Sequence, residues 1–155
     1  MDGWTADELA KLPRYYIMDL DRTMAETVAP DMPDDETVAT CDWLSEGDLR
    51  VYTEEFQRTG FQGGLNWYRC MTDEDHAREL QLFSGRTIDV PACYVAGRRD
   101  WGIYQKPGAF DAMQATICSN FVSCELVDGA GHWVQQEKPE AVIRSLKQFL
   151  QTDHR

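Results

Sequence analysis

The sequence has few basic residues and no long apolar run. Only 15 lysines and arginines stand against 27 aspartates and glutamates, which gives a formal net charge of −12. Such a charge argues against nucleic acid or an anionic membrane surface as a partner. No apolar run approaches the ~20 residues that a membrane helix needs, and no basic-then-apolar segment opens the chain. We therefore expect neither a membrane span nor a signal peptide.

Neither the cysteines nor the histidines are spaced as metal ligands. The five cysteines follow no C-x-x-C pattern, and the three histidines lie far apart with no H-E-x-x-H motif. Scattered cysteines in apolar surroundings usually behave as small buried hydrophobes, so we expect reduced thiols in a cytoplasmic protein. We expect no metal and no cofactor.

The length and composition indicate one globular domain with a real core. The chain has 155 residues, of which 43% are hydrophobic and 11% are aromatic. Its acidic excess is uneven, because residues 1–87 hold 8 basic and 19 acidic residues whereas residues 88–155 hold 7 and 8. The two portions are predicted to be different layers of structure.

Residues 1–87 read as several short helices joined by brief turns. Capping-box patterns occur at residues 5–8 (TADE) and 45–48 (SEGD), and each predicts the start of a helix. Apolar residues at three- and four-residue steps predict a further helix over residues 17–28. The acidic residues 34–36 suit the first turn of another helix. No convincing strand is found in this region.

Residues 88–155 have a different pattern, in which strands alternate with helices. Apolar runs at residues 90–97 and 122–127 predict two strands. A helix is predicted between them at residues 107–117, and a last helix begins at Pro139. This βαβα order predicts a right-handed crossover and a parallel pair of strands.

A glycine-rich turn with a histidine follows the second predicted strand. In residues 128–134 (DGAGHWV) the two glycines allow a sharp turn, and His132 is the side chain that exchanges protons most readily near neutral pH. One interpretation is a turn histidine with a structural hydrogen bond, and the other is a catalytic base.

The predicted topology favours the catalytic interpretation of His132. Asp100 follows the first predicted strand, and neighbouring strands lie ~4.8 Å apart, so the two loops can bring these side chains together. An aspartate that accepts a hydrogen bond from a histidine fixes its tautomer and stabilises the imidazolium. A surface ion pair is the alternative. The order of acid and then histidine matches the last two members of an α/β-hydrolase triad.

Residues 59–69 (TGFQGGLNWYR) combine three glycines with a dense aromatic and polar cluster. Asn66 is predicted to cap a helix that continues to Leu80. Ordinary core packing accounts for Trp67 and Tyr68, and a single tyrosine is weak support for catalysis.

Three segments together resemble the carboxyl-terminal half of an α/β-hydrolase of the epoxide hydrolase type. They are residues 59–69 (TGFQGGLNWYR), residues 90–101 (VP followed by GRRDW) and residues 129–139 (GAGHW followed by QEKP), in that order. The resemblance implies an α/β fold, with a helical cap (lid) in residues 1–87. A βαβα unit with a short parallel sheet, the carboxyl-terminal part of the hydrolase core, would follow in residues 88–155.

The resemblance also implies a reaction and a role for three residues. In this family a nucleophilic aspartate opens the epoxide and forms an ester, which water then cleaves to give a diol. Tyr68 would help to donate a proton to the departing epoxide oxygen, His132 would activate the water, and Asp100 would orient His132. The implied substrate is a small apolar epoxide.

The sequence departs from the family pattern in one large respect. No G-x-S-x-G or G-x-D-x-G motif occurs, so neither a nucleophile nor its oxyanion hole can be assigned. We expect a truncated product, one piece of a split gene or a fragment, which needs an amino-terminal half as partner and is inactive alone. Alternatives are a haloalkane dehalogenase or esterase relative, and a non-catalytic remnant or binding module.

Overall fold

The computed structural model describes residues 4–152, which form two compact units. The first unit combines the residues up to Trp43 with those from Thr87 onward, and the second is Leu44–Arg86. The predicted division into a cap of residues 1–87 and a core of residues 88–155 stays a prediction.

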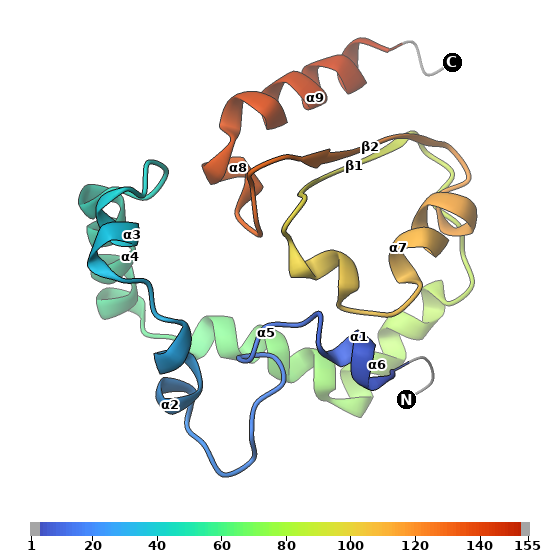
Figure 1. Ribbon diagram of the computed structural model, residues 1–155. Coiled ribbons are helices and arrows are strands. Elements are labelled where there is room, and N and C mark those ends of the chain that lie inside the picture. The colour runs from blue at the N-terminus through green and yellow to red at the C-terminus, as the bar shows by residue number, and fades with distance from the viewer. Residues whose placement is uncertain (1–3, 153–155) are drawn as a thin grey trace. The chain divides into compact units, whose positions relative to one another are not determined.

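The first unit contains a two-stranded sheet and most of the short helices (Figure 1). Its elements are α1 (Ala6–Leu9), α2 (Met24–Val28), η1 (Ala29–Asp31), α3 (Asp35–Ala39), β1 (Ala92–Gly97), η3 (Trp101–Tyr104), α7 (Ala109–Ala112), η4 (Met113–Ile117), β2 (Phe121–Val127), α8 (Val134–Glu137) and α9 (Pro139–Gln151). The second unit consists of α4 (Glu46–Thr59), α5 (Gln62–Thr72), α6 (Glu74–Leu80) and η2 (Gln81–Phe83).

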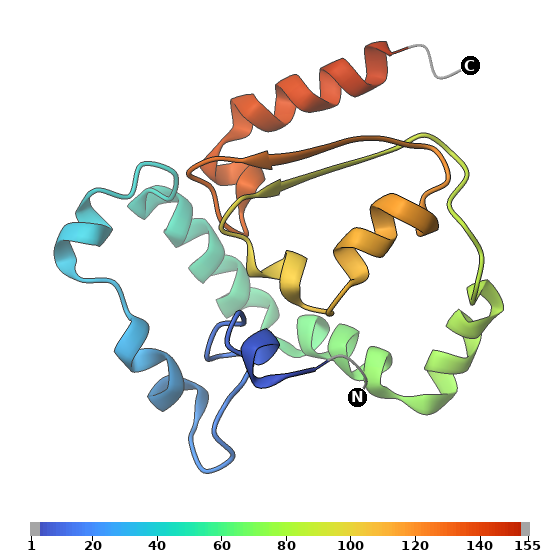
Figure 2. The ribbon, with the colours of Figure 1, turned by 45° about the vertical axis from the view of Figure 1, so that its right-hand side comes forward.

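The sheet has the predicted parallel topology. Strands β1 and β2 pair in parallel, with Val95 opposite Glu125 and Gly97 opposite Val127. Figures 1 and 2 both show α7 and α9 on opposite sides of this sheet. The α/β fold class is therefore confirmed, and the carboxyl ends of both strands lie at one edge.

The small core lies under the loop that follows β2. Val127, Ala130 and Val134 are buried and contact one another, and Val95 and Val142 pack against them. Because α8 begins at Val134, the packing of this residue fixes the chain where the loop ends and α8 begins.

The helices differ from the predicted ones where local capping competes with the apolar pattern. The helix predicted over residues 17–28 is limited to α2, because the Thr23 hydroxyl accepts from the Glu26 N–H and Glu26 caps the Thr23 N–H in return. Ile17 and Leu20 lie before this cap and are exposed. The predicted capping box at Ser45 and Asp48 is confirmed at the start of α4.

The long helix predicted at residues 107–117 is shorter and less regular. It begins at Ala109, after Gly108 in the left-handed region with φ 73°, and its second half, η4, is π-helical. The element type is right, whereas the ends of the helix and its winding are not.

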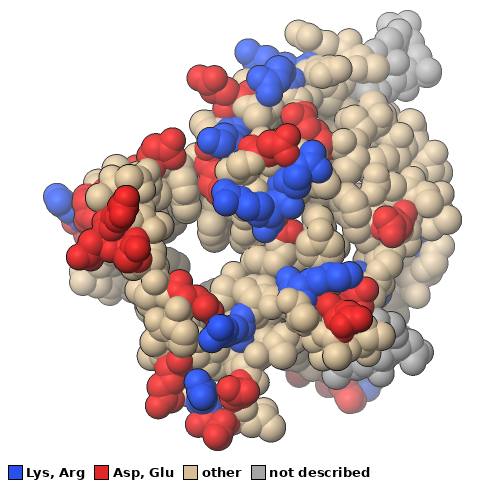
Figure 3. Space-filling view, viewed as in Figure 1, with Lys and Arg blue, Asp and Glu red and all other residues tan. Residues whose placement is uncertain are grey.

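The surface is charged, and none of the helices of residues 4–152 has the length and apolar character that crossing a membrane requires. Figure 3 shows Lys and Arg side chains among Asp and Glu on the face in view. Several of the basic residues form ion pairs, such as Arg14 with Asp31 and Arg98 with Asp128.

Candidate active site

Asp100 and His132 are brought together at the carboxyl edge of the sheet. Asp100 follows β1, His132 follows β2, and the Nδ1 atom of His132 lies 2.9 Å from Oδ1 of Asp100. Asp100 is 8% exposed, whereas the His132 side chain is 45% exposed. A carboxylate at Nδ1 favours the tautomer with its proton there, which leaves Nε2 as a proton acceptor.

The Asp100 carboxylate is itself held in place. Its Oδ1 also accepts a hydrogen bond from the Gly102 N–H at 2.7 Å, so that Asp100 caps the start of η3. The Asp100 N–H donates to the carbonyl of Gly97 at 3.0 Å. These hydrogen bonds hold the carboxylate in its orientation toward the imidazole.

Two arginines join the loop after β1 to the loop after β2. Arg98 forms an ion pair with Asp128. The backbone N–H of Arg99 donates to the Ala130 carbonyl at 3.0 Å, and its guanidinium donates to the Gly129 carbonyl at 3.0 Å. Gly129 has φ 74°, as expected for a turn glycine. The loops are thus connected mainly through main-chain oxygens.

Gly97 allows the closest approach of the two loops. A Cβ atom at this position would lie 2.2 Å from the carbonyl oxygen of Gly131 and 2.4 Å from that of Ala130. No side chain fits in this space, so only glycine lets β1 end against the histidine loop. In the sequence, Gly97 marks only a strand boundary, and no local pattern reveals this contact.

Aromatic rings surround the imidazole of His132. Trp101 stacks on it with ring centroids 4.9 Å apart and planes at 21°, and Trp133 meets it edge-on at 5.3 Å. Tyr16 in turn packs against Trp101, with ring centroids 4.1 Å apart. A tryptophan face next to an imidazolium stabilises the positive charge. No role for Trp101 was predicted from the sequence, in which its place directly after Asp100 is the available signal.

Tyr94 lies on β1 close to this site. Burial raises the pKa of its phenol, and the negative charge of Asp100 raises it further, as does Cys124. Its ring packs edge-on against Phe110, with centroids 5.5 Å apart. The neutral phenol is therefore the form that the folded state favours.

We expect the free energy of unfolding to fall at alkaline pH in part because of Tyr94. Because the pKa of Tyr94 is raised in the folded state, the folded chain keeps the phenol proton at a pH at which the unfolded chain has lost it. The stability that the neutral phenol contributes is present below the unfolded pKa of about 10 and is lost as the pH rises through the folded pKa. Tyr94→Phe should remove this part of the pH dependence, as measured by urea unfolding from neutral to alkaline pH. Cys124, whose thiol pKa burial also raises, should contribute the same sign in both proteins. An unchanged slope in Tyr94→Phe would contradict the assignment.

Tyr68 belongs to the second unit, where it lies on α5. Its side chain is 63% exposed, and its neighbour Asn66 accepts hydrogen bonds from Gln62 at 2.7 Å and Arg69 at 3.1 Å. The predicted helix cap at Asn66 is wrong, because α5 begins one turn earlier, after Phe61. The role of Tyr68 as a proton donor stays a prediction.

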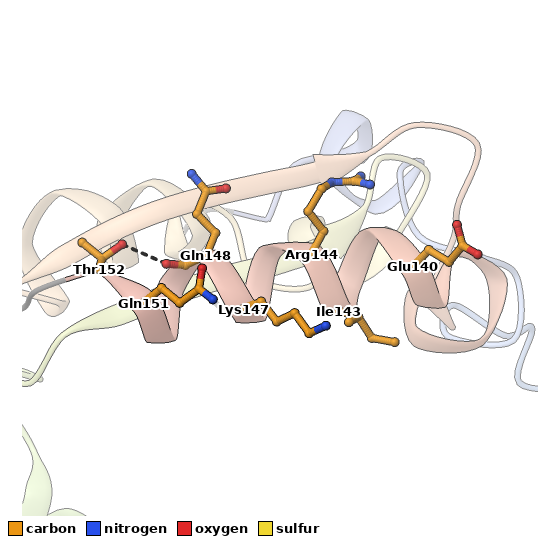
Figure 4. A pocket seen from close by; sticks show the side chains of 7 residues that line it. All are labelled: Glu140, Ile143, Arg144, Lys147, Gln148, Gln151 and Thr152. Atoms are coloured by element: carbon orange, nitrogen blue, oxygen red, sulfur yellow. Dashed lines mark hydrogen bonds between the residues drawn. The ribbon is translucent and has the colours of Figure 1, made fainter.

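A hollow along α9 is separate from the Asp100–His132 pair. The hollow runs along one side of α9, and its seven lining side chains all belong to the segment 140–152, with Glu140 and Thr152 included (Figure 4). It includes neither Asp100 nor His132 and is bounded by one helix only. In residues 4–152, no group of three or more His, Cys, Asp or Glu is arranged to hold a metal ion.

Comparison with known proteins places the chain beside epoxide hydrolases. No family model matches it. It is 41% identical over 110 residues to epoxide hydrolase A of Mycobacterium tuberculosis, which covers 70% of this chain and 32% of that protein. Among solved structures, epoxide hydrolase A from Mycobacterium thermoresistibile is 40% identical with a TM-score of 0.59, over 70% of this chain and 33% of the other.

A second solved structure extends the similarity. A laboratory-evolved variant of potato epoxide hydrolase is 29% identical with a TM-score of 0.67, over 79% of this chain and 38% of the other. The chain thus spans about a third of the length of the two mycobacterial epoxide hydrolases. It is a relative of the epoxide hydrolases in the α/β-hydrolase superfamily.

Proposed function

We propose that this chain supplies the water-activating part of an epoxide-hydrolysing site. The observation that carries the proposal is the contact between His132 and Asp100, in which a nearly buried carboxylate meets Nδ1 of a half-exposed imidazole. This arrangement suits a general base toward water near neutral pH. The similarity to epoxide hydrolases supports an epoxide as the substrate class, and the proposal takes it to be small and apolar.

The proposed reaction has two covalent steps. A carboxylate nucleophile outside these 155 residues attacks an epoxide carbon, the carbon–oxygen bond breaks, and the oxygen takes a proton from the phenol of Tyr68. Nε2 of His132 then removes a proton from water, which attacks the ester carbonyl. The ester cleaves to release the diol and the carboxylate, while Asp100 stabilises the imidazolium, and return of the imidazolium proton through water to the phenolate of Tyr68 restores both groups.

We further propose that the nucleophile comes from a polypeptide that pairs with β1. Ala92 donates to the Asn120 carbonyl and Arg98 to the Val127 carbonyl, so these alternate residues face β2. Backbone groups alternate in direction along a parallel strand, so those of Cys93 and Val95 point away from β2, toward the other side of β1. Because β1 is apolar along its length (ACYVAG), it suits an inner strand with a neighbour there.

The purified chain should form no diol from a small apolar epoxide such as styrene oxide. Diol should appear when the chain is co-purified with the part of M. tuberculosis epoxide hydrolase A that lies outside the matched 110 residues. Chiral chromatography of the product measures both reactions. Diol formation by the chain alone would refute the need for a partner, and a stable but inactive complex would refute the proposed function.

A cytoplasmic location is part of the same proposal. All five cysteines are free, which suits a reducing compartment. No specific observation favours a dehalogenase, an esterase or a binding module over the epoxide hydrolase.

A further inference from the structure

The carboxylate of Glu137 binds the backbone on both sides of His132. Its Oε2 accepts a hydrogen bond from the Gly131 N–H at 2.7 Å, and its Oε1 accepts one from the Trp133 N–H at 3.0 Å. Glu137 is the last residue of α8 and is half-buried. The side chain therefore reaches back across one helical turn to the loop that carries the imidazole.

The geometry of this contact favours a carboxylate over an amide. Each oxygen accepts from a different N–H, and hydrogen bonds to a charged acceptor are stronger than neutral ones. A glutamine has one acceptor oxygen, so its amide group would meet the second N–H with another donor. In the observed arrangement, in which each N–H meets its own oxygen, a carboxylate satisfies both peptide groups and an amide satisfies one.

The two peptide groups determine where the imidazole can lie. The Trp133 N–H belongs to the peptide group directly after His132, and the Gly131 N–H belongs to the peptide group before Gly131, so fixing them restricts the backbone between Ala130 and Trp133. Farther away, the loop is fixed by the buried Ala130 and Val134. Between these anchors, Glu137 holds the backbone around His132 together with the Arg99 N–H, which binds the Ala130 carbonyl, and the 2.9 Å contact with Asp100 depends on the orientation of that backbone.

We propose that Glu137 is a positioning residue, which keeps the His132 imidazole on Asp100 with its Nδ1 protonated. Its catalytic consequence rests on the proposed function, because only there does His132 act as the base. In that reaction the loss of Glu137 slows ester hydrolysis and leaves ester formation unchanged. The structural part concerns His132 alone and can be tested without turnover.

The test uses the full chain labelled with ¹⁵N-histidine. Only three histidines are present, and His132→Gln identifies the signals of His132. Long-range ¹H–¹⁵N spectra above the pH range of imidazole protonation report which ring nitrogen carries the proton. In the unmodified chain we expect His132 to carry it on Nδ1, and exchange of this proton with water to be slow.

Glu137→Ala should give a mixture of tautomers and roughly tenfold faster exchange of the Nδ1 proton, as expected for lost hydrogen bonds. Glu137→Gln should give an intermediate result, and it replaces the alanine variant if that protein does not fold. Glu140→Gln is the matched control, because Glu140 is exposed on α9 and its substitution removes the same charge. It should leave the spectrum of His132 unchanged.

Three outcomes would overturn the proposal. They are a His132 without a dominant Nδ1-protonated form in the unmodified chain, unchanged spectra in Glu137→Ala, and equal effects of Glu137→Gln and Glu140→Gln. A lower unfolding temperature with an unchanged tautomer would mean that Glu137 stabilises the fold only. Since no substrate is used, these results do not depend on whether the protein hydrolyses epoxides.

Discussion

His132→Gln should stop turnover of the complemented protein while a covalent ester accumulates. Glutamine cannot take a proton from water, and removal of a general base typically lowers the rate by ~10²–10⁴-fold. Ring opening does not require this base, so the enzyme should be trapped after the first step. Intact-mass spectrometry should show that the mass of the polypeptide with the nucleophile has increased by that of one epoxide molecule. Quenched activity assays should show no diol.

Tyr68→Phe is the matched comparison because it removes a proton donor from the other step. It should slow ring opening in single-turnover experiments and leave no ester to accumulate. A His132→Gln protein with normal steady-state rates would show that His132 is not the base. Accumulation of ester in both variants would show that Tyr68 does not act in ring opening.

Gly97→Ala should destabilise the first unit more than an alanine at any other glycine in the loops after β1 and β2. The added Cβ would lie 2.2 to 2.5 Å from the backbone of Gly131 and Ala130, and these main-chain atoms cannot rotate away. Overpacking of this kind costs about 1–3 kcal/mol and occasionally more. Urea unfolding measures the loss, and the histidine spectra should change with it, since the displaced loop carries His132.

The same substitution at Gly47 provides a control with the opposite sign. Gly47 lies in α4, and a Cβ there would be 3.5 Å from the Ser45 hydroxyl, which is an ordinary contact. Since alanine favours a helix by up to about 1 kcal/mol over glycine, Gly47→Ala should stabilise α4. Equal stability of the Gly97→Ala and unmodified proteins would mean that the loops can separate at little cost.

Much of the sheet and half of the site could be predicted from the sequence. Both strands are apolar runs with turn residues near their ends, and two parallel strands require their carboxyl ends to lie at one edge. That rule alone placed Asp100 beside His132, whose contact the structure shows at 2.9 Å. The capping box at Ser45 could also be predicted, because its donors and acceptors lie within one helical turn.

The remaining features depend on contacts that local patterns do not contain. The apolar spacing from Ile17 resembled a helix, but the Thr23 cap and the exposure of Leu20 show that no packing supports one there. The contact at Gly97 is a backbone approach between segments that lie more than 30 residues apart. Glu137 was noted only as part of the segment 129–139, because its two hydrogen bonds depend on the turn that folds its side chain back onto Gly131 and Trp133.

The contacts between the loops after β1 and β2 have a consequence for how this site tolerates mutation. Arg99 bonds to the carbonyls of Gly129 and Ala130, and Gly97 abuts the carbonyls of Ala130 and Gly131. Every one of these carbonyl oxygens is present whatever side chain its residue carries. The spacing of the acid and the base is thus encoded by a few positions, and sequence drift in the surrounding helices can proceed without separating them.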